Sequence, residues 1–196
     1  MPRLAEIAHV SADDYLAGED RAGVKHEYVD GLVYAMAGAD EAHVTVAGNV
    51  FALLRAHLRG GPCRVYIADM KLCVQQANVY FYPDVFVTCD AADAERRQAK
   101  EAARVVIEVL SDSTEGFDRG EKFEHYRLLP TLAEYVLIDP RRRSVEVFSR
   151  QEDGWLLRPA PADGALVIAS LDFSCSMEAV YEDVVPESEP ATGAAR

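Results

Sequence analysis

The stretch YFYPDVFVTCD, residues 80–90, places the carboxylate of Asp84 among strand-forming aromatic and β-branched residues, directly after a proline. A second stretch, RVVIEVLSDST over residues 104–114, surrounds Glu108 with valine, isoleucine and leucine. A carboxylate within an apolar strand costs several kcal/mol unless a cation or hydrogen bonds compensate its charge. Two such acids in neighbouring strands therefore predict a site for a divalent cation, and their hard oxygen ligands suit Mg²⁺ or Mn²⁺.

The residues before these stretches predict a short helix, a hairpin and a long helix. Ser11 can cap the short helix because its hydroxyl accepts hydrogen bonds from amides of the first turn. The pair Asp30-Gly31 tolerates the positive φ of a two-residue turn between the strand-like runs of KHEYVDGLVYAM, residues 25–36. Apolar residues recur every three or four positions over residues 41–58, which predicts an amphipathic helix that ends at the following Gly-Gly-Pro.

Short runs rich in valine, isoleucine, tyrosine and phenylalanine predict the strands of the remaining chain. One helix fits between them over residues 118–129, because apolar residues keep a helical period until Pro130 ends the pattern. The predicted strands are residues 64–74, 79–88, 104–110 and 134–138, followed by an antiparallel meander over 145–149, 155–158 and 165–169 and by a last helix over 177–184.

Without its flanking elements the predicted order is α, β, β, β, α, β, which indicates an α/β fold with a mixed sheet and helices on its faces. The 196 residues suffice for one domain that buries about 70% of its unfolded surface. We expect a single domain over residues 1–184, with its core at about residues 26–148. Residues 185–196, rich in proline, alanine and glutamate, are expected to form a flexible tail.

The chain is acidic overall but nearly neutral in its middle. Its formal net charge of −13 argues against a polyanionic partner. Residues 21–150 nevertheless carry 17 basic and 19 acidic side chains, so most of the net negative charge lies in the flanking segments. A nucleic-acid interpretation must therefore rest on local basic residues and on metal ions that offset carboxylates.

The four cysteines form no C-x-x-C pair, which excludes a zinc knuckle and a thioredoxin-like motif. We expect all four to be free thiols in a cytoplasmic protein. The first residues carry acids where a signal peptide needs a basic start and an apolar stretch. No apolar run reaches the roughly 18 residues of a membrane span, so we expect neither export nor membrane association.

Four short motifs, taken together, point to one nuclease family. They are Tyr82-Pro83-Asp84, Ile107-Glu108-Val109-Leu110-Ser111, Asp118-Arg119-Gly120-Glu121-Lys122 leading to Tyr126, and Glu134-Tyr135-Val136-Leu137-Ile138-Asp139-Pro140. In this order they resemble the Uma-type restriction endonuclease family of the PD-(D/E)XK nuclease superfamily, over about residues 26–148. The common core of that superfamily has the α-β-β-β-α-β order, so the resemblance implies a restriction-endonuclease-like fold with an added N-terminal hairpin and C-terminal antiparallel strands.

The resemblance also implies that Asp84 and Glu108 bind Mg²⁺ or Mn²⁺, and that a metal-activated water hydrolyses phosphodiester bonds in DNA. One position departs from the superfamily pattern, because Leu110 stands where a lysine is expected two residues after the acid. The resemblance implies that Lys122 takes this role from the following helix. Lys122 would position or help to deprotonate the attacking water and stabilise charge on the phosphate.

Three further residues are candidates whose alternatives stay open. Glu27 is either a third catalytic acid that enters the site from the hairpin or an exposed strand glutamate. His43, near the start of the long helix, suits a substrate contact as well as a polar contact within the fold. Lys71, a candidate for substrate binding, alternates with Asp69 on one strand face that could reach the same pocket.

The sequence thus predicts a Mg²⁺-dependent endodeoxyribonuclease with Asp84, Glu108, Lys122 and Glu27 as catalytic residues. The alternative is a catalytically inactive nucleic-acid-binding or assembly module that kept the nuclease fold. Three polar groups retained among apolar neighbours favour the enzyme, whereas the net charge favours the module. We also expect a homodimer, because two copies of a nuclease fold often meet a two-fold symmetric duplex.

Overall fold

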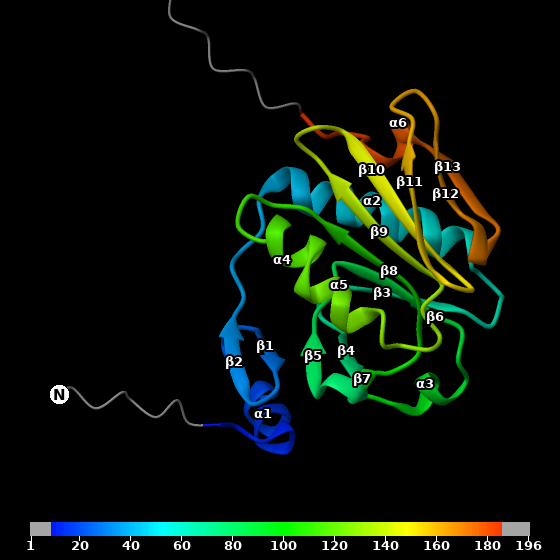
Figure 1. Cartoon of the computed structure of the whole chain (residues 1–196). Helices are drawn as coiled ribbons and strands as arrows, with labels where there is room; N and C mark the ends of the chain where they lie inside the picture. Colours follow the sequence, from blue (N-terminus) through cyan, green and yellow to red (C-terminus); the bar gives the residue numbers. More distant parts are fainter. Residues whose placement is uncertain (1–8, 186–196) are drawn as a thin grey trace, which may run out of the picture.

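The N-terminal elements match their sequence signals in the computed structural model, which describes residues 9–185 (Figure 1). Helix α1 (Ala12–Glu19) begins at Ser11, whose hydroxyl accepts a hydrogen bond from the amide of Asp14. Strands β1 (His26–Val29) and β2 (Leu32–Ala35) form the predicted hairpin. Its turn residues have positive φ angles, 42° at Asp30 and 92° at Gly31, which explains why this pair stands there.

Three sheets hold the strands. Their orders are β2-β1-β5-β4-β7 in a five-stranded sheet, β11-β10-β9-β8-β6-β3 in a six-stranded sheet, and β12-β13 in a two-stranded sheet. The strands not yet bounded are β3 (Arg64–Ile67), β4 (Lys71–Val74), β5 (Val79–Phe81), β6 (Val85–Thr88), β7 (Ala99–Lys100), β8 (Ala103–Val109), β9 (Glu134–Asp139), β10 (Ser144–Gln151), β11 (Gly154–Ala160), β12 (Ala165–Ile168) and β13 (Phe173–Ser176).

The predicted strands 64–74 and 79–88 are each divided into two shorter strands, one in each of the larger sheets. Ala68 adopts a φ of 51° between β3 and β4, so the first prediction of one continuous strand was wrong there. Tyr82, Pro83 and Asp84 interrupt the second, and proline has no N–H for a sheet ladder. The chain therefore crosses between the two sheets at both places.

The six-stranded sheet carries helices on both faces, as the sequence predicted (Figure 1). Helix α2 (Glu41–His57) buries Val46, Val50 and Leu54 against one face. On the other face, Phe123 of helix α5 (Glu121–Tyr126) stacks on Tyr135 of β9, with 4.6 Å between the ring centroids. The aromatic core on this second face also joins the six-stranded sheet to the five-stranded sheet.

The predicted helix over 118–129 is two short helices, α4 (Glu115–Arg119) and α5. Gly120 separates them with φ −110° and ψ −103°, a break that the conformational freedom of glycine permits. The sequence period does not show this break, because the apolar residues that define it, Phe123, Tyr126 and Leu129, all follow Gly120. The remaining short helices are α3 (Ala92–Glu95), α6 (Met177–Val180), η1 (Gln75–Ala77) and η2 (Ala169–Leu171).

The C-terminal strands do not form the single predicted meander. Strand β12 pairs with β13 instead of β11, and the predicted last helix over 177–184 is limited to α6. Strand β13 was absent from the prediction because its sequence, FSCS, contains few strong strand formers. The predicted tail, residues 185–196, lies outside the described residues apart from Val185.

The expectation of four free thiols was wrong for two of the cysteines. Cys63 and Cys89 form a disulfide, whereas Cys73 and Cys175 are free. The antiparallel register pairs Arg64 of β3 with Thr88 of β6, so the residues just beyond each lie opposite one another. Sequence spacing cannot reveal a cross-strand pair of this kind.

Within residues 9–185, every helix is too short or too polar to cross a membrane.

Candidate active site

Glu108 projects from β8 onto the sheet face that carries α5. Strand alternation sends Val105, Ile107 and Val109 to the α2 face, and Glu108 to the opposite one. The residue is only 2% exposed. The hydroxyl of Tyr126 donates a hydrogen bond to its Oε1 over 3.0 Å. Burial raises the pKa of Glu108 well above its usual range, and the nearby ammonium of Lys122 opposes this effect only in part.

Asp84 lies at the crossing between the two large sheets, just before β6. The amide of Val109 donates a hydrogen bond to Asp84 Oδ2 over 2.8 Å, and the amide of Asp84 donates one to Glu108 Oε2 over 3.1 Å. Each carboxylate is therefore held by the backbone of the segment that carries the other. This reciprocal arrangement brings the two predicted metal ligands together.

Lys122 reaches into the same place from α5 and is 6% exposed. Its Nζ lies 3.0 Å from Glu108 Oε1, 3.2 Å from Glu27 Oε1 and 3.5 Å from Asp118 Oδ1. Burial alone would lower its pKa, but these carboxylates outweigh burial and raise the pKa well above the usual value. The raised pKa favours the protonated, positively charged form of Lys122 within this cluster.

Glu27 joins the site from the β1–β2 hairpin. Its Oε1 accepts a hydrogen bond from the amide of Tyr82 over 3.2 Å, in addition to the contact with Lys122. The side chain is 13% exposed, which does not fit the alternative of an exposed strand glutamate. The structure thus brings Glu27 together with Asp84, Glu108 and Lys122.

Asp118 is the member of the cluster that sequence reasoning did not single out, although it opens one of the motifs. It lies four residues before Lys122, in α4, and burial raises its pKa. The hydroxyl of Tyr135 donates a hydrogen bond to its backbone carbonyl over 2.8 Å, which fixes this turn against β9. The spacing of four residues to a lysine was the available signal, but an acid and a lysine at this spacing occur on many exposed helices.

His43 contacts Asp84 from the first turn of α2. Its Nε2 lies 2.9 Å from Asp84 Oδ1, and hydrogen bonding and charge interaction with Asp84 raise the pKa of the imidazole against the opposing effect of burial. Its Nδ1 is buried and has no hydrogen-bond partner among residues 9–185. The observed contact is therefore the polar contact within the fold.

Lys71 lies in β4 and is buried, with 7% of its surface exposed. Its Nζ lies 5.3 Å from the ring centroid of Tyr82, two residues before Asp84. None of the contacts found in the described part of the chain joins Lys71 to the acids of the cluster. Its role in substrate binding remains a prediction.

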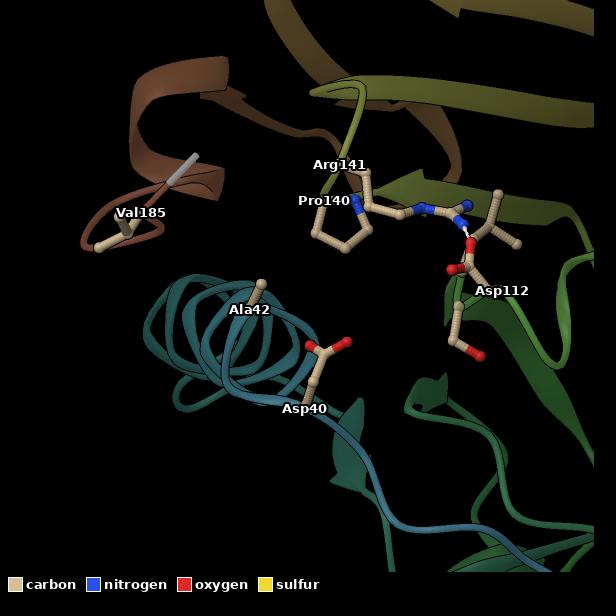
Figure 2. Close-up of a pocket in the computed structure, with 8 residues that line it drawn as sticks. Asp40, Ala42, Asp112, Pro140, Arg141 and Val185 are labelled. Carbon is tan, nitrogen blue, oxygen red and sulfur yellow. Dashed lines mark hydrogen bonds and ion pairs between the residues drawn. The ribbon is translucent and has the colours of Figure 1, made fainter. Parts of the chain in front are cut away.

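A small pocket of about 50 Å³ lies between the start of α2 and the segments that follow β8 and β9 (Figure 2). Asp40 lines it at the start of α2, and Leu110 and Ser111 line it just after β8. Across the pocket from Asp40, Arg141 pairs with Asp112 (Figure 2), and this arginine also pairs with two further carboxylates. Arg141 is therefore committed to intramolecular ion pairs, and the pocket does not reach Asp84, Glu108 or Lys122.

The donor set fits a divalent cation. Three carboxyl groups, those of Glu108, Glu27 and Asp118, contact Lys122, and Asp84 adjoins Glu108, so oxygen donors outnumber the one cation of the cluster. Within residues 9–185 no group of three or more acidic, histidine or cysteine side chains is arranged as a complete ligand set. Mg²⁺ does not need one, because it binds through one or two carboxylates and keeps water or phosphate oxygens.

The chain matches a known protein family over most of its length. A family model named Uma2, with the description "Putative restriction endonuclease", matches residues 12–180. The chain belongs to the Uma2 family. This confirms the resemblance drawn from the four motifs, and it extends the region of similarity beyond them at both ends.

Two proteins of Synechocystis sp. are relatives of this Uma2 chain. One, named "Uncharacterized protein slr1290", is 35% identical over 178 residues, which cover 90% of the chain and 94% of the relative. The other, named "Uncharacterized protein sll1609", is 33% identical over 165 residues, which cover 83% and 93%.

A solved structure confirms the predicted fold class. It is a crystal structure from Anabaena variabilis ATCC 29413, described as "a putative nuclease belonging to DUF820". The TM-score is 0.68 at 16% identity, over 88% of this Uma2 chain and 97% of the solved chain. The likeness establishes a restriction-endonuclease-like fold of mixed α/β type. The Uma2 family and this fold together support a nuclease.

Proposed function

We propose that this Uma2 protein is a metal-dependent endonuclease that hydrolyses phosphodiester bonds in DNA. The observation that carries the proposal is the reciprocal pairing of Asp84 and Glu108 through backbone amides, beside a buried lysine. Burying several charged groups in one place is costly unless they serve a common ligand. Strained or perturbed groups of this kind cluster at functional sites.

Asp84 and Glu108 would hold Mg²⁺ or Mn²⁺. When bound, the cation would act as a Lewis acid that polarises a phosphate oxygen, and it would lower the pKa of a bound water molecule. Asp84 keeps one carboxylate oxygen on the Val109 amide and the other on His43, which fixes the plane of its carboxylate. The Tyr126 hydroxyl and the Asp84 amide donate hydrogen bonds to the two carboxyl oxygens of Glu108, which fixes the plane of that group.

Lys122 supplies a fixed positive charge for the negative charge that develops on the phosphate. Its ammonium forms ion pairs with Glu108, Glu27 and Asp118, so its position does not depend on substrate. Preorganised charge of this kind needs no rearrangement during the reaction. Glu27 positions Lys122, and His43 is retained as a candidate for contact with substrate near Asp84.

We propose that the chain forms one domain over residues 1–184. Two copies of it would form a homodimer that acts on DNA in the cytoplasm. A two-fold symmetric pair of sites suits the two strands of a duplex. The Cys63–Cys89 disulfide weighs against the cytoplasmic part, because structural disulfides are rare in reducing compartments.

A second candidate is a catalytically inactive nucleic-acid-binding or assembly module. The formal net charge of −13 favours it over the enzyme, because an acidic surface repels phosphates and slows a nuclease's encounter with its substrate. Binding without cleavage is the result that would support this module.

Nicking of supercoiled plasmid DNA tests the proposal. We expect cleavage with Mg²⁺ or Mn²⁺, no cleavage in EDTA, and none by Asp84→Asn or Glu108→Gln variants that keep the parent's circular dichroism spectrum. Glu178→Ala, a change at an exposed acid of α6, is the matched control and should cleave like the parent. Equal cleavage in EDTA or by folded Asp84→Asn protein would reject the metal-dependent mechanism.

A further inference from the structure

Tyr34 is an exposed aromatic residue on β2. Strand β2 is one of the two edge strands of the five-stranded sheet (Figure 1). Tyr34 is 51% exposed. Within residues 9–185 its ring stacks on no other aromatic ring and its hydroxyl has no hydrogen-bond partner. A single exposed tyrosine needs no explanation by itself, so its position relative to the acidic cluster decides whether it has a role.

The hairpin register places Tyr34 directly opposite Glu27. Opposed residues of an antiparallel pair share one face of the sheet, with Cβ atoms about 4.5–5.5 Å apart. Glu27 reaches Lys122 on that face, with 3.2 Å between Oε1 and Nζ. Tyr34 is therefore at the border of the cluster, on the side where the hairpin is open to solvent.

The opposite face of the hairpin is already filled. Tyr28 stacks there on Tyr15 of α1, with 5.1 Å between centroids, and lies 6.0 Å from the ring of Tyr80. Tyr28 is 1% exposed, so this aromatic group serves the core. Tyr34 differs from it in both face and exposure.

Because the charge of this protein does little to attract nucleic acid, a contact that does not depend on charge would contribute more of the binding affinity. Residues 21–150, which hold Tyr34 and the cluster, carry 17 basic and 19 acidic side chains, so this region gains little from the general attraction between cations and phosphates. Stacking of a nucleobase on an aromatic ring does not depend on net charge, and every base offers a π face for it.

We propose that Tyr34 stacks on an unpaired nucleobase of the strand whose phosphate enters the acidic cluster. The ligand class is single-stranded or locally opened nucleic acid, because the bases of a closed duplex are not available for stacking. The inference rests on the proposed nuclease function for its substrate, and it adds the residue that holds the base next to the reacting phosphate.

Binding of a single-stranded oligonucleotide that carries 2-aminopurine tests the role of Tyr34 without cleavage. Measured in EDTA, the fluorescence of this base falls when it stacks on an aromatic ring. The parent and Tyr34→Phe should bind with similar affinity and quench the probe. Tyr34→Leu should bind about 5- to 100-fold more weakly, as expected for the loss of one stacked base, and should not quench it.

Val33→Ala is the matched control, because Val33 is the neighbouring residue on β2, 41% exposed, and points to the opposite face. It should bind and quench like the parent, and all variants should keep the parent's thermal midpoint. The ratio of affinities between parent and Tyr34→Leu should be the same at 50 and 200 mM salt, because stacking releases no counterions.

Equal affinity and quenching by parent and Tyr34→Leu would overturn the inference, as would no binding by the parent. The outcomes for function and for Tyr34 are separable. Metal-dependent cleavage that is unaffected by Tyr34→Leu leaves the endonuclease in place and rejects the stacking role. Binding that depends on Tyr34, with no cleavage under any metal, supports the stacking role and rejects hydrolysis.

Discussion

The ammonium of Lys122 lies 3.0 Å from the carboxylate of Glu108, and both side chains are almost completely buried. Removing one member of such a pair leaves the other desolvated and without its partner. The pair also joins α5 to β8, so its loss affects the fold as well as the proposed reaction.

Replacement of Lys122 should slow the proposed reaction by about 10²- to 10³-fold, the usual loss for one electrostatic stabiliser. Lys122→Gln retains most of the length without the charge, so it should be impaired to a similar extent as Lys122→Ala. Single-turnover cleavage at saturating Mg²⁺ measures the effect. Arg127→Gln, a change at a half-exposed cation that caps α5, is the control and should leave the rate unchanged. Parent-like rates in both Lys122 variants would exclude the catalytic role.

Lys122→Gln should also reduce the free energy of unfolding by about 3 kcal/mol, because Glu108, Glu27 and Asp118 lose their shared cation. Urea denaturation measures this loss. Added Mg²⁺ should raise the midpoint more in the variant than in the parent, since the cation then offsets the unpaired acids. A loss below about 0.5 kcal/mol, typical of an exposed lysine, would contradict the buried cluster.

Crystals soaked in Mn²⁺ should bind the cation between Asp84 and Glu108, at the roughly 2.0–2.2 Å distances that hard cations of this size prefer. Anomalous scattering locates the ion. The Asp84→Asn crystal, soaked in the same way, should show much lower occupancy. Manganese found only on the surface of well-occupied parent crystals would reject the assignment of these two ligands.

Tyr126→Phe should reduce the free energy of unfolding by about 1–3 kcal/mol, the usual cost of leaving a buried hydrogen-bond acceptor without its donor, because Glu108 loses the Tyr126 hydroxyl. Tyr181→Phe is the comparison, since this hydroxyl donates to the backbone carbonyls of Asp139 and Ser144. Its loss should be about 0.5–1.5 kcal/mol. Chemical denaturation of both variants measures the two losses of unfolding free energy. A larger loss in Tyr181→Phe than in Tyr126→Phe would show that Glu108 does not depend on Tyr126.

Reduction of the Cys63–Cys89 disulfide should reduce the free energy of unfolding by about 2–4 kcal/mol, because it releases a loop with a sequence separation of 26 residues in the unfolded chain. Thermal unfolding with and without dithiothreitol measures the change. The double variant Cys63→Ser/Cys89→Ser should unfold at the lower midpoint under both conditions. A parent midpoint that does not respond to reductant would show that the two thiols are unlinked in solution.

The proximity of Asp84 and Glu108 could be predicted from sequence because each stands among apolar neighbours, a context that is costly without a partner. Glu27 and Lys122 were harder to assign, because a glutamate in a hairpin and a lysine in a helix are normally solvated. Lys122 was assigned from the motif resemblance. In the structure Lys122 is buried and contacts both Glu27 and Glu108. Asp118 was missed for the same reason, since its burial depends on how α4 packs.

The fold class followed from the order of elements, but the division of strands between sheets did not. Periodicity reports which residues are apolar and not where a strand bends, so residues 64–74 and 79–88 each read as one strand. The disulfide was missed because it depends on register between β3 and β6, which is a long-range property. Each miss concerns contacts between segments, whereas the correct predictions rest on local pattern or motif.

The crossing from β5 to β6 contains only Tyr82, Pro83 and Asp84. The Tyr82 amide donates a hydrogen bond to Glu27. The Asp84 carboxylate accepts one from the Val109 amide, and the Asp84 amide donates one to Glu108. Pro83, which has no N–H, separates the two. An inserted or deleted residue at this point would turn Asp84 away from Glu108. The length of this crossing is therefore tied to the contact between Asp84 and Glu108, so a change of one residue here should abolish the proposed metal site even where both acids are kept.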